Sequence, residues 1–327
     1  MILIFSQQNE DSTNQVIDWL LYKNHPFIRL NTSDILDAEK FSIILNNDGA
    51  NIFLKIHGKE LNINNIGSVW FKRWWEVLSL NEDIKNLEFK SALNKNINIE
   101  IKSISSYLFW KLRDRYWLNY FDNVHISKLI QMEIAINIGL SIPNTIISNM
   151  QDDFISFLQK NPETITKPIN EALSYKEYAF YTSSINMEDI SWYEKKMFPS
   201  MLQKKVKKAF EIRVFFLDEY FYPIAIFSQQ NDNTEIDSRK IDFSNPIRMV
   251  KYNIPMDLQI KLKKMAKLLN LNSGSFDLIK TDAGDYVFLE INPVGQFGFV
   301  SAIYNNCIEK DIANWLIEKD KLYGKGN

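Results

Sequence analysis

The stretch that decides the fold is S-F-D-L-I-K-T (275–281), D-A-G-D (282–285) and Y-V-F-L-E-I-N (286–292), followed by P-V-G-Q-F-G (293–298). Two apolar runs around a short polar segment predict a β-hairpin. If Thr281 pairs with Tyr286, Asp277 lies directly opposite Glu290, and Asn292 shares their face because side chains alternate along a strand. The opposite face is then apolar and faces the core, and it consists of Phe276, Leu278, Val287, Leu289 and Ile291.

The facing carboxylates have a chemical consequence. Like charges directly opposite each other destabilise a strand pair unless a cation lies between them. Carboxylate and amide oxygens, without His or Cys, favour a hard ion such as Mg²⁺ or Mn²⁺ over zinc. A solvent-exposed polar face without any metal would give the same alternation, so the spacing alone leaves both interpretations open.

Length and composition describe a folded protein with balanced charge. The 327 residues suffice for two or three packed units, and 46% of them are hydrophobic. With 38 basic and 40 acidic residues the net charge is −2, which argues against a nucleic-acid binder. The single cysteine, Cys307, cannot form an intramolecular disulfide, and neither a signal-peptide pattern nor a membrane-spanning apolar run is present. We expect a soluble cytoplasmic protein that binds neither nucleic acid nor membrane.

The pattern along the chain predicts three parts. Residues 1–122 form an α/β domain that opens with a β-α-β unit whose helix is capped at Asp11–Thr13. Residues 123–198 begin with an amphipathic helix ended by Gly139, and residues 199–327 contain the hairpin and a terminal helix. The other expected elements are a hairpin over 41–45 and 51–56, a strand over 68–75, helical spacing over 82–120, strands over 164–169, 200–206, 211–216 and 222–228, and a helix over 257–269.

The motifs that precede the hairpin resemble those of one enzyme superfamily. G-L-S-I-P-N-T (139–145), T-K-P (166–168) and P-S-M-L-Q-K-K-V-K-K-A-F-E-I-R-V (199–214) follow the order found in ATP-grasp ligases. W-F-K-R-W (70–74), D-S-R (237–239) and F-L-E-I-N-P-V-G-Q (288–296) are most similar to its peptide-modifying branch, the microviridin-type and grasp-with-spasm graspetide synthetases. The resemblance implies an α+β ATP-grasp fold, with an N-terminal α/β pre-ATP-grasp domain (1–122) and with central (123–198) and C-terminal (199–327) domains that clasp ATP.

The resemblance also assigns roles to residues. It implies that Asp277, Glu290 and Asn292 hold Mg²⁺, with two ions expected and Mn²⁺ as a substitute. Arg213 and Arg239 match positions near the γ-phosphate and the acyl phosphate, where a planar guanidinium can hold phosphate at two points. The implied nucleotide contacts are Lys128, Lys167, the hinge residues Gln203, Lys204, Lys205 and Val206, and Lys208 and Glu211. The expected substrate contacts are Arg73, Arg248 and Gln296.

The implied activity is that of an ATP-dependent peptide macrocyclase. An Asp or Glu side chain of a precursor peptide, which has a leader and a core, becomes an acyl phosphate with release of ADP. A Ser or Thr hydroxyl, or a Lys amine, then displaces phosphate to form an ester or amide crosslink. Three alternatives stay open: a ligase that adds free glutamate to a peptide or protein tail, a small-molecule kinase, and a nucleotide-binding regulator without turnover. The leader-binding candidates are residues 107–120 and 170–195, and the resemblance implies a homodimer.

Two positions depart from the superfamily pattern. No glycine-rich loop follows Lys167-Pro168, and the peptide-modifying branch lacks this loop as well. Lys204 stands where the family frequently has glutamate, so the contact expected there is in doubt. Competing motifs fail, because the chain has no G-x-S-x-G elbow and no complete P-loop.

Overall fold

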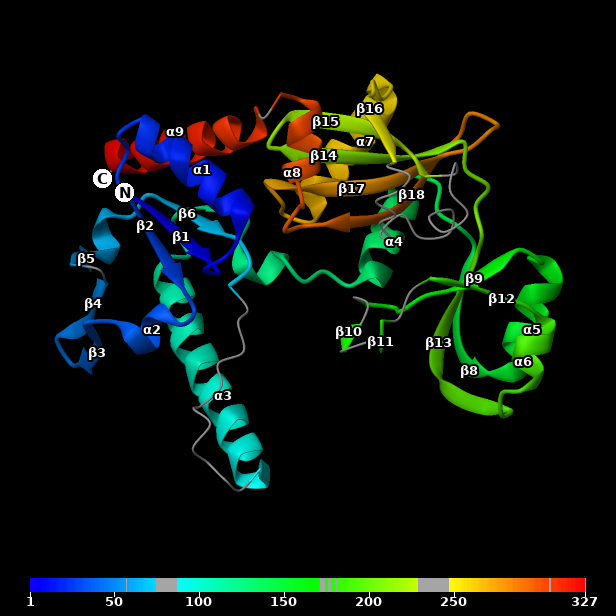
Figure 1. Cartoon of the computed structure of the whole chain (residues 1–327), viewed down its shortest axis with the longest axis horizontal. Coiled ribbons are helices and arrows are strands. Elements are labelled where there is room, and N and C mark those ends of the chain that lie inside the picture. The colour runs from blue at the N-terminus through cyan, green and yellow to red at the C-terminus, as the bar shows by residue number, and fades with distance from the viewer. Residues whose placement is uncertain are drawn as a thin grey trace. The chain divides into compact units, whose positions relative to one another are not determined.

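The computed structural model describes residues 1–56, 58–74, 87–170, 174–175, 178–179, 182–228, 247–305 and 307–326 (Figure 1). It divides into two compact units. Unit 1 contains Met1–Val124 and Asn305–Asn327, and unit 2 contains His125–Tyr304. The end of the chain therefore packs with its beginning. The three-part division at residues 122 and 198 stays a prediction.

Unit 1 is built on a four-stranded parallel sheet of order β2-β1-β6-β7. The predicted β-α-β opening is confirmed, since one helix joins the two strands at this edge. The predicted cap is wrong by one position: the Glu10 carboxylate accepts a hydrogen bond from the Thr13 backbone N–H at 2.6 Å, and the helix begins at Asp11. These elements are β1 (Ile2–Ser6), α1 (Asp11–Tyr22), β2 (Phe27–Asn31), α2 (Asp34–Asp37), β6 (Ser68–Phe71) and β7 (Tyr116–Leu118).

The rest of unit 1 comprises a small antiparallel sheet, two long helices and two short 3-10 helices. The predicted hairpin at 41–45 and 51–56 is confirmed, with Asn46 paired to Gly49 across the turn. The helical spacing over 82–120 is only partly correct, because residues 116–118 pair with β6 as a strand. The elements are β3 (Lys40–Asn46), β4 (Gly49–Ile56), β5 (Lys59–Leu61), η1 (Ile63–Asn65), α3 (Leu87–Lys111), η2 (Phe121–Asn123) and α9 (Ile308–Gly326).

Aromatic rings and one buried carboxylate hold unit 1 together. Phe5 and Phe109 pack edge to face at 4.9 Å between ring centroids, and Phe5 contacts Trp74 at the same distance. Asp320 on α9 is buried and accepts hydrogen bonds from His25 Nε2 at 2.7 Å and from the Gly67 N–H at 3.0 Å. This carboxylate therefore ties α9 to the segments that precede β2 and β6.

The first part of unit 2 is a four-stranded antiparallel sheet of order β12-β9-β13-β8. Two helices cover it, and their apolar residues, including Phe154, Leu158 and Ile190, form its core. The predicted strand over 164–169 ends three residues early, before Pro168, which has no N–H for a ladder. The elements are β8 (Thr145–Met150), α5 (Gln151–Lys160), β9 (Thr164–Thr166), β12 (Ser183–Ile185), α6 (Met187–Ser191) and β13 (Lys196–Lys204), with a separate pair formed by β10 (Ser174–Tyr175) and β11 (Tyr178–Ala179).

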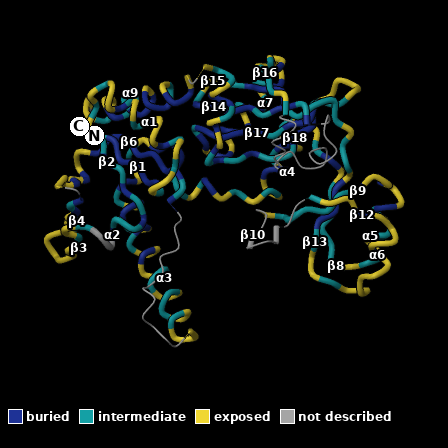
Figure 2. Tube along the Cα trace, viewed as in Figure 1, coloured by how far each residue is buried: buried dark blue, intermediate teal, exposed yellow. Residues whose placement is uncertain are grey.

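The second part of unit 2 is a five-stranded antiparallel sheet of order β16-β15-β14-β17-β18. Its apolar face packs against two helices around Val214, Phe276 and Leu262 (Figure 1). The central strands β14 and β17 are the most buried of this sheet (Figure 2). The elements are α4 (Lys128–Asn137), β14 (Phe210–Leu217), β15 (Tyr220–Phe227), β16 (Arg248–Lys251), α7 (Met256–Leu268), β17 (Ser273–Lys280), β18 (Tyr286–Asn292) and α8 (Gly298–Ile303).

The hairpin of β17 and β18 differs from the predicted register at its turn. Lys280, rather than Thr281, pairs with Tyr286, and a bulge near Leu289 then restores the pairing of Asp277 with Glu290. A bulge adds one residue to one strand and therefore reverses the alternation beyond it. Phe288, fully buried opposite Leu278, takes the core position that we predicted for Val287 and Leu289.

Candidate functional site

Three strands bring the predicted site residues onto one face of the second sheet. Arg213 of β14 pairs with Asp277 of β17, which pairs with Glu290 of β18. Asn292 lies two residues beyond Glu290 and points to the same side. On β14, Glu211 shares this face with Arg213. We call Glu211, Arg213, Asp277, Glu290 and Asn292 the polar face.

Asp277 is held by one cation and one amide. The Arg213 Nη1 atom lies 3.3 Å from Asp277 Oδ1, and the Asn292 Nδ2 group donates to Asp277 Oδ2 at 2.9 Å. Burial raises the pKa of Asp277 to about 6, against the opposing attraction of Arg213 and with help from the nearby charge of Glu290. A carboxylate that resists ionisation this strongly is suited to a place that a cation occupies.

Glu290 is held by a lysine from the helix beneath the sheet. Lys128 Nζ lies 2.7 Å from Glu290 Oε2, and Asn292 Nδ2 lies 3.5 Å from Glu290 Oε1. Burial would raise the pKa of Glu290, but the charges of Lys128 and then Lys167, together with these hydrogen bonds, lower it. The two facing carboxylates thus differ, because burial outweighs the attraction of nearby cations and raises the pKa of Asp277, whereas the lysines and hydrogen bonds outweigh burial and lower the pKa of Glu290.

Helix α4 fixes the strand that carries Glu290 and Asn292. The buried Gln131 side chain accepts from the Ile291 N–H at 2.9 Å and donates to the Ile291 carbonyl at 3.1 Å. Ser141 adds a carbonyl that accepts from the Phe288 N–H at 2.8 Å. These contacts cover the free edge of β18, which is the outer strand. Sequence reasoning missed Gln131, since a buried glutamine on an amphipathic helix has no distinguishing motif.

Two of the predicted nucleotide lysines lie close to this pair of acids. Lys128 contacts Glu290 directly, and Lys167, just beyond the end of β9, is near enough for its charge to lower the pKa of Glu290. Both lysines therefore belong to the site. In the part of the chain that the structure describes, no three His, Cys, Asp or Glu side chains are placed to hold one metal ion together. The nearest oxygen donors here are two carboxylates and one amide.

The predicted hinge, Gln203 to Val206, spans the end of β13, whose last residue is Lys204. Gln203 is buried and donates to the Thr145 hydroxyl at 2.9 Å. The Lys204 and Lys205 N–H groups donate to the carbonyls of Asn144 and Glu163, each at 2.8 Å. Those two donors are therefore committed to neighbouring chain segments. Within the described ranges, the Val206 N–H has no backbone acceptor.

Lys208 and Glu211 form a network at the N-terminal end of β14. Lys208 Nζ contacts the Glu211 carboxylate, and it lies 3.0 Å from the hydroxyl of the buried Ser228. The charge of Glu211 contributes to the raised pKa of Asp277. The predicted pair therefore belongs to the same electrostatic cluster as the two facing acids.

The remaining predicted residues are dispersed. Arg239 lies outside the described residues. Arg73 belongs to unit 1, where its φ of +56° ends β6, so the predicted strand over 68–75 stops at Phe71. Trp70 and Trp74 are buried. Arg248 pairs with Phe227, one residue out of phase with the polar face, and its guanidinium lies 5.2 Å from that ring.

The segment after β18 contains contacts that the sequence did not indicate. Gln296 is exposed, whereas Gly295 has a φ of +55° and a Cβ there would lie 3.3 Å from Gly274. The close approach of Gly295 is to strand β17. In α8, the Phe299 ring lies 5.4 Å from the Arg213 guanidinium. An aromatic ring at this distance attracts a cation and restricts its orientation.

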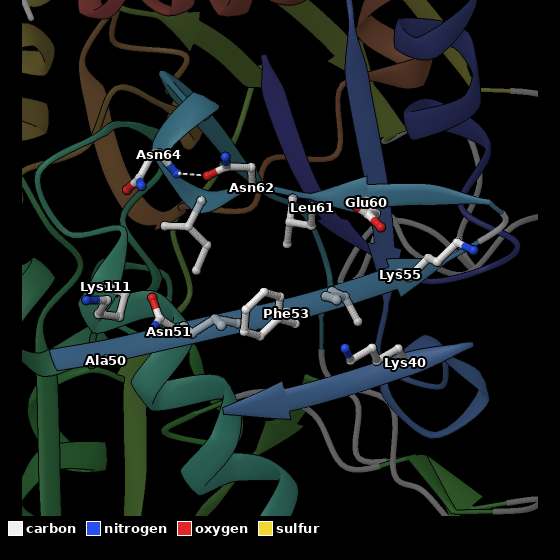
Figure 3. Close-up of a pocket in the computed structure, with 13 residues that line it drawn as sticks. Lys40, Ala50, Asn51, Phe53, Lys55, Glu60, Leu61, Asn62, Asn64 and Lys111 are labelled. Atoms are coloured by element: carbon white, nitrogen blue, oxygen red, sulfur yellow. Dashed lines mark hydrogen bonds between the residues drawn. The ribbon is translucent and has the colours of Figure 1, made fainter. Parts of the chain in front are cut away.

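A separate pocket of about 340 Å³ lies in unit 1, between β4, β5 and the end of α3 (Figure 3). The Phe53 ring lies at its centre, with the Lys40 ammonium 5.1 Å from the ring centroid. Asn62 accepts a hydrogen bond from the Asn64 N–H at 3.0 Å on the opposite wall. None of the predicted site residues lines this pocket.

Comparisons with known proteins agree with the predicted fold. Residues 1–125 match the family model of the MvdD pre-ATP grasp domain. A RiPP-associated ATP-grasp ligase of Chryseobacterium gregarium, solved with ADP and a leader and core peptide, is 23% identical, with a TM-score of 0.83 over 97% of this chain and 96% of that one. The macrocyclase MdnC of Microcystis aeruginosa MRC, bound with precursor peptide MdnA, is 24% identical, with a TM-score of 0.78 over 97% of this chain and 99% of that one.

A third solved structure extends the likeness. The ATP-grasp ligase PsnB, complexed with a minimal precursor, Mg and ADP, is 17% identical, with a TM-score of 0.77 over 98% of this chain and 97% of that one. No curated protein sequence matches the chain. The chain therefore has the ATP-grasp fold with a pre-ATP-grasp domain at its N-terminus, as predicted. The predicted resemblance to graspetide synthetases is likewise confirmed.

Proposed function

We propose that this protein is an ATP-dependent peptide macrocyclase. One observation carries the proposal: a row formed by Arg213, Asp277 and Glu290 lies on one sheet face of an ATP-grasp fold, with Lys128 and Lys167 beside it. The solved neighbours that support it are a ligase in complex with a leader and core peptide, a macrocyclase bound with a precursor peptide, and a ligase complexed with a minimal precursor. The proposed crosslink joins an Asp or Glu side chain to a Ser or Thr hydroxyl or to a Lys amine.

The residues present fit Mg²⁺. Asp277 and Glu290 supply carboxylate oxygens, and the side-chain amide of Asn292 contacts both carboxylates and offers its own oxygen after rotation. An all-oxygen donor set of this kind suits a small hard cation that completes its shell with water and phosphate. When bound, Mg²⁺ supplies positive charge to the phosphates. Two ions, and Mn²⁺ as a substitute, are part of the proposal.

The surrounding cations and the hinge fit a nucleotide. Lys167 and Lys128 place two ammonium groups next to the acids, where they would neutralise phosphate charge. The Val206 N–H is the hinge donor that we assign to the adenine edge, since those of Lys204 and Lys205 are already used. Lys208 and Glu211 would support the part of the nucleotide site next to this hinge.

The proposed reaction has two balanced steps. A carboxylate oxygen of the peptide forms a bond to the γ-phosphorus of ATP, the bond from that phosphorus to the β-γ bridging oxygen breaks, and ADP leaves. A hydroxyl oxygen or amine nitrogen of the same peptide then attacks the acyl carbon, phosphate leaves, and the nucleophile's proton passes to solvent. Arg213 holds the reacting carboxylate or the transferred phosphoryl group, because its planar fork suits either anion. We also assign Arg239 to the γ-phosphate and the acyl phosphate.

Incubation with ATP, Mg²⁺ and the peptide encoded beside the gene tests the proposal. We expect ADP formation and a peptide that has lost one water per crosslink, measured by intact mass and located by fragmentation. Glu290→Gln should abolish both products, because it removes a carboxylate ligand of the proposed metal site. An unmodified peptide from every neighbouring gene would overturn the macrocyclase assignment.

A glutamate-adding ligase is the second candidate. A RimK domain ATP-grasp protein of Sphaerobacter thermophilus has a TM-score of 0.55 to this chain, well below those of the peptide ligases. ADP release that depends on free glutamate, with a gain of mass on the acceptor, would favour this candidate.

A homodimer and a cytoplasmic location also belong to the proposal. Among the described helices, none combines the length and apolar character required to cross a membrane.

A further inference from the structure

A second cation lies in the same row as the reacting groups. Ile224 of β15 pairs with both Arg213 and Lys251, so the cross-strand row runs Lys251, Ile224, Arg213, Asp277, Glu290. Side chains at paired positions leave the sheet on the same face. Neighbouring strands are about 4.8 Å apart, which places the backbone of Lys251 about 10 Å from that of Arg213. Lys251 is exposed, whereas Ile224 is fully buried between the two cations.

The segment that follows the hairpin contacts both cations with aromatic rings. The Phe299 ring lies 5.4 Å from the Arg213 guanidinium, and the Tyr304 ring lies 4.8 Å from Lys251 Nζ. Tyr304 is itself fixed, because its hydroxyl donates to the Pro223 carbonyl at 3.0 Å. Cations held over rings in this way lose orientational freedom before any ligand arrives. Phe299 of helix α8 and Tyr304, which follows the helix, therefore restrict two cations, one at each side of Ile224.

The position of Lys251 selects the class of ligand. The acids and the two nucleotide lysines lie on one side of Arg213, whereas Lys251 lies on the other side, about 14 Å from Asp277 across three strands. Phosphates held beside Asp277 and Glu290 are therefore too far away to be its partner. An anion beyond the reacting carboxylate belongs to the peptide, and the anionic side chains of peptides are carboxylates.

We propose that Lys251, positioned by Tyr304, binds a second carboxylate of the peptide substrate while Arg213 holds the reacting one. The inference rests on the proposed function, and it concerns a second acidic side chain of the same peptide. Lys251 would act as a specificity determinant. Arg248, on the same strand, points to the opposite face and takes no part.

Binding of tetraglutamate to the full chain loaded with ADP and Mg²⁺ tests this without turnover. Lys251→Gln should weaken binding about tenfold, as expected for the loss of a charge-assisted contact. Lys251→Arg should bind within about twofold of the original chain, because it keeps the cation over the ring. Lys264→Gln is the matched control, since it removes an exposed lysine from α7, which packs on the other face. Tetraglutamine should not bind.

Equal binding by the original chain and Lys251→Gln, or no binding of tetraglutamate at all, would overturn the proposal. A second arm measures ADP formation with the precursor peptide encoded beside the gene. Lys251→Gln should raise KM about tenfold and leave kcat within about twofold, since the contact is remote from the reacting bond. Failure of the original chain to remove water from this peptide would count against the macrocyclase function instead, while the tetraglutamate result still decides the role of Lys251.

Discussion

Replacement of Asp277 by Asn should stabilise the metal-free protein while it destroys metal binding. Burial raises the pKa of Asp277 from 3.8 to about 6, so the folded protein disfavours the ionised carboxylate. The difference of about 2 corresponds to roughly 3 kcal/mol, an upper limit because Asp277 and Glu290 interact. Asparagine resembles the neutral acid, and its oxygen can still accept the hydrogen bond that Asn292 Nδ2 donates.

The sign of the pH dependence follows from the direction of this shift. A carboxylate whose folded pKa is raised contributes its stability fully below the unfolded pKa, near pH 4, and loses it as the pH rises through 6. The original chain should therefore lose stability relative to Asp277→Asn between pH 4 and pH 6. At pH 7.5 the variant should be the more stable of the two.

Scanning calorimetry in EDTA at several pH values measures the difference. For a unit of this size, 3 kcal/mol corresponds to an increase in Tm of up to roughly 6–12 °C at pH 7.5. Asp282→Asn is the matched control, since this exposed aspartate lies in the turn of the same hairpin and should change stability by less than about 0.5 kcal/mol. Added Mg²⁺ and ADP should then raise the Tm of the original chain but not that of Asp277→Asn. A lower Tm for Asp277→Asn at pH 7.5 would refute the reasoning, as would a gain that persists unchanged at pH 4.

Three further substitutions test other parts of the fold. Gln131→Leu should lower the free energy of unfolding by roughly 2–4 kcal/mol and abolish ADP formation, because it leaves the buried Ile291 N–H and carbonyl unpaired. Calorimetry and an ADP assay measure the two effects. Full activity would contradict the role of Gln131. Gly295→Ala should lower the free energy of unfolding by roughly 1–2 kcal/mol, because the residue has a φ of +55°. Gly298→Ala is the control and should leave stability unchanged, since the space around its new Cβ is open. Equal unfolding curves for the two variants would contradict the prediction. Asp320→Ala should destabilise unit 1 by roughly 1–3 kcal/mol in denaturant unfolding, since the Gly67 N–H and His25 lose their acceptor.

Local pattern predicted the two strands of the hairpin and the pairing of its two acids. Glu290 is observed opposite Asp277, although Lys280 rather than Thr281 pairs with Tyr286. The bulge at Leu289 escaped prediction because alternation is read one strand at a time, whereas a bulge depends on what the partner strand and the core require. Phe288 fills a core position because it is large and apolar. The bulge at Leu289 then places one extra residue in β18 relative to β17.

The sequence by itself determined which residue types surround the proposed metal site, since their order along the chain is a local property. Only the tertiary structure decided that Gln131 holds β18, that Phe299 and Tyr304 hold two cations, and that Lys251 shares a row with Arg213. These contacts join residues far apart in the chain, so they depend on strand order and register rather than on local spacing. Four hydrogen-bonded strand pairs create that row, and no window of the sequence contains it.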